Sequence, residues 1–205
     1  QKIFILRWPG YGEWMLAHDM RPSYQEYKNF LRIMVERVPD KQLILKCPDH
    51  MWYLDDLLEV FPDACIVWTH RDPSRSIPSY CSLASLNWRL LYGEFESKKL
   101  GPYIEERFLT GIQRALATRE KLGEERFLDV NFVELLEDPV KAVNKITSYF
   151  DLNPVSESKM TEYLNPDRPD NRGKHKYTAE HYGIDRESIQ ARFKQYTDRF
   201  GVPVS

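Results

Sequence analysis

The sequence predicts an α/β fold with three layers, in which a mostly parallel sheet is flanked by helices. Residues 43–45 and 64–68 are short apolar runs without alternation, as expected for parallel strands that are covered on both faces. Between them, residues 54–61 carry leucines at the spacing of an amphipathic helix. The order strand, helix, strand predicts a parallel pair joined by a right-handed crossover.

The length and charge of the chain restrict what it can be. We expect its 205 residues to form a single domain, since a chain of this length buries a sizeable core. A net charge of −2 provides no broad basic surface for nucleic acid, so any anion must be bound by a local cluster. No apolar run reaches the ~18 residues that a membrane-spanning helix needs.

The three cysteines, Cys47, Cys65 and Cys81, do not have the spacing of metal ligands. Two of them lie in predicted core elements, so we expect free thiols in a reducing compartment. The sequence therefore predicts a cytoplasmic protein without a metal site.

A helix is predicted upstream of the first strand. Residues 1–6 are compatible with a strand or the end of a helix, and residues 7–12 are predicted to form a loop. Ser23 and Glu26 form a capping box, which predicts that a helix begins there and ends before Pro39. Its apolar face is expected to pack on the sheet, or against a second subunit in a homo-oligomer. This face comprises Tyr24, Tyr27, Phe30, Leu31, Met34 and Val38.

Both predicted strands end in charged or reactive residues. In open α/β sheets, ligands bind outside the carboxyl ends of the strands, so a functional site is expected at this edge. The residues at the edge are Lys46, Asp49 and His50 after the first strand, and His70, Arg71 and Asp72 after the second.

The segment after the second strand has the features of a phosphate clamp. Asp72 is a good helix N-cap and Pro73 a good first helical residue. The planar guanidinium of Arg71 can bind a phosphate, and the free N–H groups of the helix N-terminus favour the same anion. Ser79 lies two turns along, on the face of Asp72, and can donate a hydroxyl. In the alternative interpretation, Arg71 pairs with a carboxylate and Ser79 faces a neighbouring helix.

Beyond this segment the chain continues to alternate between helix and strand. The helix that begins at Pro73 is expected to end near Asn87. Residues 88–99 are a mixed segment whose aromatic side chains either border a ligand pocket or belong to the core. Residues 127–132 are predicted to form a third strand. Further helices are predicted at residues 101–123, 139–150, 156–164 and 180–200.

These residues resemble a known family. Residues 46–50 (KCPDH), the leucine-rich helix and residues 61–79 (FPDACIVWTHRDPSRSIPS) are similar to the core of the sulfotransferases, in particular the bacterial-type branch. The resemblance extends, more loosely, to the C-terminus. It implies a P-loop nucleotide-hydrolase-like fold and 3′-phosphoadenosine 5′-phosphosulfate (PAPS) as donor. It also implies adenosine 3′,5′-bisphosphate as product, and no metal ion.

The resemblance implies roles for the residues at the sheet edge. Arg71 and Ser79 would hold the 3′-phosphate of the donor. His50 is the candidate base that deprotonates the acceptor, and an unperturbed imidazole pKa near ~6.5 suits this task. Lys46 would lie near the sulfuryl group and neutralise charge there. A histidine that only caps or packs at the start of a helix is the alternative for His50.

The same resemblance implies further donor contacts near the C-terminus. Residues 165–177 are predicted from composition to be a solvated basic loop. In the family, a loop of this kind folds over the donor, and Arg172, Gly173 and Lys174 are similar to its 3′-phosphate-binding residues. Phe132 stands where the family usually has a tyrosine beside the adenine, and it can stack on the base or belong to the core.

One family element is missing from the sequence. Sulfotransferases bind the 5′-phosphosulfate with an N-terminal loop, but neither Gly-x-x-x-x-Gly-Lys-Ser/Thr nor a Pro-Arg-Ser-Gly-Thr-Thr-like turn is present. We therefore expect the domain of residues 1–205 to be incomplete at its N-terminus. A non-catalytic nucleotide-binding or scaffold domain is the alternative. A P-loop-like kinase would need the missing loop and a Mg²⁺-binding hydroxyl.

The predicted reaction is an in-line transfer of a sulfuryl group to a hydroxyl or amine, catalysed mainly by positioning and electrostatic stabilisation. Small molecules, sugars and lipids all remain open as acceptors. Aromatic residues in the segments 7–22 and 87–101 suggest only that the acceptor is partly apolar.

Overall fold

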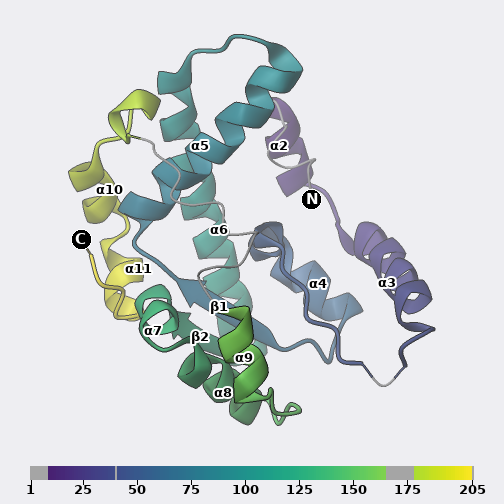
Figure 1. Ribbon diagram of the computed structural model, residues 1–205. Coiled ribbons are helices and arrows are strands. Elements are labelled where there is room, and N and C mark those ends of the chain that lie inside the picture. Colours follow the sequence, from purple (N-terminus) through teal and green to yellow (C-terminus); the bar gives the residue numbers. More distant parts are fainter. Residues whose placement is uncertain (1–8, 40, 165–177, 205) are drawn as a thin grey trace.

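Helices surround a short parallel sheet (Figure 1). The computed structural model describes residues 9–39, 41–164 and 178–204. Its strands, β1 (Ile66–His70) and β2 (Phe127–Asn131), pair in parallel, with Ile66 opposite Phe127 and His70 opposite Asn131. Two long helices, α5 (Pro73–Tyr92) and α6 (Leu100–Leu122), connect the strands.

Helices cover both faces of the sheet, because successive side chains of a strand point to opposite sides. On one face, Phe127 packs in a core cluster with leucines of α4 (Leu54–Val60) and with Ala115 of α6. On the other face, Leu128 and Val130 pack against α8 (Pro139–Tyr149). This arrangement confirms the predicted three-layer α/β class.

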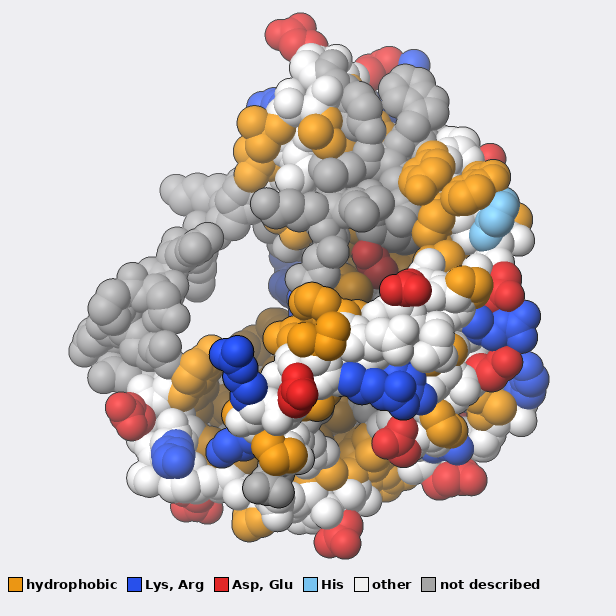
Figure 2. All heavy atoms as spheres, turned by 90° about the vertical axis from the view of Figure 1, so that its right-hand side faces the viewer, with side chains coloured by type: hydrophobic (Ala, Val, Ile, Leu, Met, Phe, Trp, Pro, Cys, Tyr) orange, Lys and Arg blue, Asp and Glu red, His pale blue; other side chains and the backbone are white. Residues whose placement is uncertain are grey.

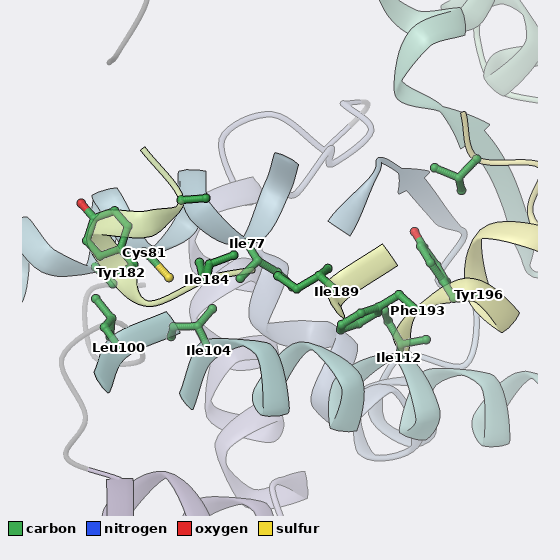
Figure 3. Close-up of a cluster of buried hydrophobic side chains, with 13 residues drawn as sticks. Ile77, Cys81, Leu100, Ile104, Ile112, Tyr182, Ile184, Ile189, Phe193 and Tyr196 are labelled. Atoms are coloured by element: carbon green, nitrogen blue, oxygen red, sulfur yellow. The ribbon is translucent and has the colours of Figure 1, made fainter. Parts of the chain in front are cut away.

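The largest core cluster joins α5 and α6 to the C-terminal helices (Figure 3). Ile77 of α5 packs there with Ile189 of α10 (Arg186–Arg192) and with Phe193. The single helix predicted for residues 180–200 is wrong. It is divided into η3 (Glu180–Tyr182), α10 and α11 (Lys194–Arg199). Gly183 ends η3 in a left-handed conformation with φ 69°, and a turn at Phe193 separates α10 from α11.

Residues 43–45 do not form a strand, contrary to the sequence prediction. Their side chains are exposed, and that of Ile44 is 87 % exposed. A strand is stabilised by hydrogen bonds and side-chain packing with a partner, and within the described residues the sheet consists of β1 and β2 alone. The segment leads instead into the 3₁₀ helix η1 (Pro48–Tyr53).

The N-terminal helices also differ from the prediction. Residues 9–12 of the segment expected to be a loop belong to α2 (Pro9–Leu16), whereas residues 1–8 lie outside the described residues. α3 (Arg21–Val35) begins before Ser23. The predicted capping box is therefore wrong. Asp19 accepts a hydrogen bond from the backbone N–H of Arg21 at 2.9 Å, and this contact satisfies the start of the helix.

α3 packs on α4 rather than on the sheet. Lys28 donates a hydrogen bond to the carbonyl of Val60 at 2.8 Å, and Tyr24 and Leu31 are the buried residues of α3. The rest of the predicted apolar face is mostly exposed, including Phe30. Figure 2 shows the side of the molecule that carries α3, where hydrophobic side chains lie between interspersed acidic and basic ones.

The remaining elements follow the predicted order, but α5 continues to Tyr92 and so passes the predicted end near Asn87. β2 ends one residue earlier than predicted because Phe132 begins a helix. No helix within the described ranges combines the length and apolar character that crossing a membrane requires. The other short elements are η2 (Ser97–Lys99), α7 (Phe132–Glu137) and α9 (Glu157–Tyr163).

Candidate active site

A cavity of about 510 Å³ lies beside β1, between this strand and the segment that contains η1. The helix α4 connects η1 to β1. Residues from the two predicted groups, one near η1 and one at the end of β1, therefore line the same cavity. Much of the lining is apolar, including Met51, Phe108 and Ile112. Four predicted site residues line the cavity: Lys46, His50, Arg71 and Phe132.

η1 positions His50. Pro48 stands at the start of this 3₁₀ helix, where the fixed backbone angle and the missing N–H of proline suit a first turn. The Nδ1 atom of His50 lies 3.0 Å from the hydroxyl oxygen of Tyr24 on α3. Burial lowers the pKa of His50. The imidazole is therefore neutral at pH 7 and can accept a proton.

Tyr24 is a site residue that sequence reasoning missed, because its spacing placed it with the core side chains of α3. It is indeed buried, and burial raises the pKa of its hydroxyl, which stays protonated at neutral pH. The hydrogen bond to His50 joins residues 26 positions apart. No local pattern could have revealed it, since the contact depends on how α3 packs on η1 and α4.

The start of α5 positions Arg71. Asp72 accepts hydrogen bonds from the backbone N–H and the hydroxyl of Ser74, both at 2.8 Å, which confirms it as the N-cap. The Arg71 guanidinium lies 4.6 Å from the centre of the Phe132 ring, in a cation–π contact. No carboxylate within the described parts of the chain pairs with Arg71, whose side chain is exposed. Its charge is therefore available to an anionic ligand.

The other predicted residues occupy different positions. Ser79 is half-buried and is not among the residues that line the cavity, whereas Ser76, one turn earlier, is. The Ser76 hydroxyl donates to the carbonyl of Asp72 at 3.1 Å. Lys46 is exposed beside the cavity. Arg172, Gly173 and Lys174 lie outside the described residues.

The cysteines near the cavity are free thiols. Burial raises the pKa of Cys47 and of Cys65, so both remain protonated at neutral pH. Protonated thiols are poor nucleophiles and poor metal ligands. Over the part of the chain that the structure describes, no group of three His, Cys, Asp or Glu side chains could hold a metal ion.

Comparison with known proteins gives a consistent result. Residues 6–157 match the model of a sulfotransferase family. The chain is 27% identical over 160 residues to the omega-hydroxy-beta-dihydromenaquinone-9 sulfotransferase Stf3 of Mycobacterium bovis and to that of Mycobacterium tuberculosis. The match covers 73% of this chain and 40% of each relative.

Two solved structures are similar to the fold. Sulfotransferase STF9 from Mycobacterium avium aligns with a TM-score of 0.85 at 28% identity, over 98% of this chain and 53% of that one. Sulfotransferase STF1 from Mycobacterium tuberculosis H37Rv aligns with a TM-score of 0.77 at 28% identity, over 91% and 48%. The chain thus spans about half the length of these proteins or less. Since the family model covers most of its residues, the chain belongs to the sulfotransferase family.

Proposed function

We propose that this protein transfers a sulfuryl group from PAPS to a hydroxyl group of a largely apolar acceptor. The observation that carries the proposal is that His50 and Arg71 line the same cavity. One residue supplies a neutral base and the other a cation for a phosphate. Family membership makes sulfuryl transfer the reaction that fits this pair.

In this proposal, Arg71 binds the 3′-phosphate of the donor. Its exposed guanidinium is held over Phe132 and can form two parallel hydrogen bonds to phosphate oxygens. The nearby N-terminus of α5, which has twenty residues, favours the same negative charge. Phe132 offers a flat apolar surface to the adenine. Ser79 and the residues Arg172, Gly173 and Lys174 remain predicted contacts of the same phosphate.

The reacting groups lie on the side of η1. The acceptor oxygen attacks sulfur and forms a new S–O bond, while the bond between sulfur and the oxygen of the 5′-phosphate breaks. The electron pair of that bond stays on adenosine 3′,5′-bisphosphate, and His50 takes the proton of the acceptor. Lys46, beside the same cavity, neutralises charge on the transferred group or the leaving oxygen.

The acceptor is proposed to be lipid-like. The name of the Stf3 relatives gives a hydroxylated dihydromenaquinone as their acceptor, and the lining of the present cavity includes Met51, Phe108 and Ile112. Apolar walls favour an acceptor that is mostly apolar, and in this proposal His50 takes the proton of the acceptor's hydroxyl group. The free thiols of the chain suit a reducing compartment such as the cytoplasm.

Calorimetric titration tests the proposal. We expect the purified protein to bind adenosine 3′,5′-bisphosphate at least about tenfold more tightly than adenosine 5′-monophosphate, because only the first carries the phosphate for Arg71. Equal affinities, or no binding of either nucleotide by the full-length protein, would contradict the donor assignment. Binding with discrimination but without transfer from labelled PAPS to any alcohol, in the full-length protein, would favour the non-catalytic nucleotide-binding domain.

Replacing Tyr24 by phenylalanine is expected to lower kcat about tenfold, with little change in the KM for PAPS. To act as a base at Nε2, His50 must keep its proton on Nδ1, and this N–H then donates to the Tyr24 oxygen 3.0 Å away. The variant keeps the ring but loses this acceptor, which corresponds to one hydrogen bond in the transition state. Steady-state kinetics with varied PAPS measures both constants.

Tyr27→Phe is the matched control. The Tyr27 ring also flanks His50, with 6.3 Å between the ring centres, and the substitution removes a hydroxyl from the same helix. It should leave kcat within about twofold of the parent value. If the two variants lose activity equally, or neither loses any, Tyr24 does not orient the base.

A further inference from the structure

A network of hydrogen bonds holds the residue that directly precedes Arg71. His70, the last residue of β1, is 1 % exposed. Its Nε2 atom lies 2.8 Å from a carboxylate oxygen of Asp129 on β2, and its Nδ1 atom lies 2.9 Å from the hydroxyl oxygen of Tyr196 on α11. Three elements that are distant in sequence therefore meet at one imidazole.

Arg119 completes this network. It donates to both carboxylate oxygens of Asp129, at 2.7 and 3.0 Å. Burial acts to raise the pKa of Asp129, but hydrogen bonds from His70 and Arg119 outweigh it and hold this pKa well below its usual range. Asp129 is therefore a carboxylate that only accepts hydrogen bonds, and the Nε2 atom of His70 must be the donor.

The other end of the network lies next to the donor-binding residue. His70 directly precedes Arg71, so holding the imidazole between Asp129 and Tyr196 anchors the chain at the point where Arg71 leaves β1. Burial raises the pKa of the Tyr196 hydroxyl, which therefore stays protonated at neutral pH and can take part in the hydrogen bond to His70.

The surrounding rings leave the imidazole little freedom. Phe200 stacks on His70 with 4.0 Å between ring centres and an interplanar angle of 15°. The ring of Trp68, two residues earlier on β1, has its centre 5.1 Å from that of His70. Tyr196 itself lines the cavity. Hydrogen bonds and ring packing on a buried residue beside a ligand contact limit the movement of that contact.

We propose that Tyr196 is a positioning residue, which acts with His70 and Asp129 to fix the backbone of Arg71 so that its guanidinium meets the 3′-phosphate of the donor. The inference rests on the proposed function. It gives α11, of which Tyr196 belongs to the core, a part in donor binding. If the network served only to attach α11, its loss would affect stability but not the preference for a 3′-phosphate.

The test compares two nucleotides in the Tyr196→Phe variant of the intact protein. Affinity for adenosine 3′,5′-bisphosphate should fall about fivefold to tenfold, the fold-change of one lost hydrogen bond, while affinity for adenosine 5′-monophosphate stays unchanged. In an Arg71→Ala background the same substitution should have no further effect on the bisphosphate, because the contact that it positions is gone.

Tyr182→Phe provides the control. Tyr182 is also buried, and its hydroxyl lies 3.3 Å from that of Ser85, away from the residues that line the cavity. Its loss should lower the unfolding temperature without changing the preference between the two nucleotides. His70→Gln is the second test variant. The glutamine amide has a donor and an acceptor, but it lacks the rigid ring that stacks on Phe200 and holds both contacts in place, so we expect the same selective loss.

The outcomes separate the two proposals. If the parent protein does not prefer the bisphosphate, the proposed function fails and the positioning role fails with it. If the parent prefers it, and Tyr196→Phe and His70→Gln keep that preference in full, only the positioning role is overturned. An equal loss of affinity for both nucleotides would also overturn it, since that result indicates a general structural effect.

Discussion

Substitution of His50 by glutamine is expected to lower kcat for sulfuryl transfer by about 10²- to 10⁴-fold, the usual contribution of a positioned general base. Glutamine is similar in size and can still hydrogen-bond to Tyr24, which lies 3.0 Å from Nδ1 in the parent protein. It cannot take the proton of the acceptor. Initial rates with ³⁵S-labelled PAPS, and an acceptor that the parent protein uses, measure the effect.

The pH dependence of the parent rate gives a second measure of the same group. Because burial lowers the pKa of His50, the base remains unprotonated below its ordinary value of 6.5. The acidic limb of kcat against pH is therefore expected below pH 6.5, with the rate falling as the imidazole gains its proton. The limb should be absent from the residual activity of His50→Gln.

Two control measurements test whether the loss of rate is specific to the base. His181→Gln, the same chemical change at an exposed histidine of η3, should leave the rate unchanged. Affinity of His50→Gln for adenosine 3′,5′-bisphosphate should stay within about twofold of the parent value, since His50 is assigned to the acceptor. A His50→Gln variant with a normal kcat would show that another group removes the proton.

Substitution of Arg71 by alanine is expected to weaken binding of adenosine 3′,5′-bisphosphate by about 2 kcal/mol or more, which is roughly a 30-fold change in Kd. The guanidinium is exposed, lies 4.6 Å from the centre of the Phe132 ring and is placed by the capped start of α5. Removing it deletes the charged contact with the 3′-phosphate. Calorimetry at fixed ionic strength is the appropriate measurement, because salt screens such a contact.

Arg71→Lys should give an intermediate loss, since lysine keeps the charge but not the planar pair of donors. Affinity for adenosine 5′-monophosphate should not depend on Arg71. Arg89→Ala, which removes an exposed arginine from the last turn of the same helix, is the matched control and should bind normally. An equal loss for both nucleotides in Arg71→Ala would argue against a contact with the 3′-phosphate.

Several features of this protein were determined by the sequence itself. The apolar run that became β1, the amphipathic pattern of α4 and the Asp72–Pro73 helix start are local properties, set by residues that are neighbours along the chain. The order of these elements placed His50 and Arg71 at the ends of the same unit. The residues of that unit also carried the resemblance to the sulfotransferases, which the comparisons confirmed.

The errors in the sequence prediction arose where structure depends on a partner. Residues 43–45 have the composition of a strand, but a strand needs another strand beside it. The spacing of Ser23 and Glu26 fits a capping box, but the helix starts earlier, where Asp19 accepts from the backbone N–H of Arg21. Ser79, selected by its spacing from Asp72, stays a predicted phosphate contact, and Ser76 is the α5 serine among the residues that line the cavity.

Only the tertiary structure decided which polar groups meet. Tyr24 is hydrogen-bonded to His50, 26 residues away in the sequence, and Tyr196 is hydrogen-bonded to His70, 126 residues away. In the sequence, each tyrosine occupies one position in the apolar pattern of a predicted helix. Neither its residue type nor its spacing distinguishes it from the other residues of that pattern. Spacing along a chain fixes which face of a helix a residue occupies, whereas a hydrogen bond between helices depends on packing that brings two distant faces within about 3 Å.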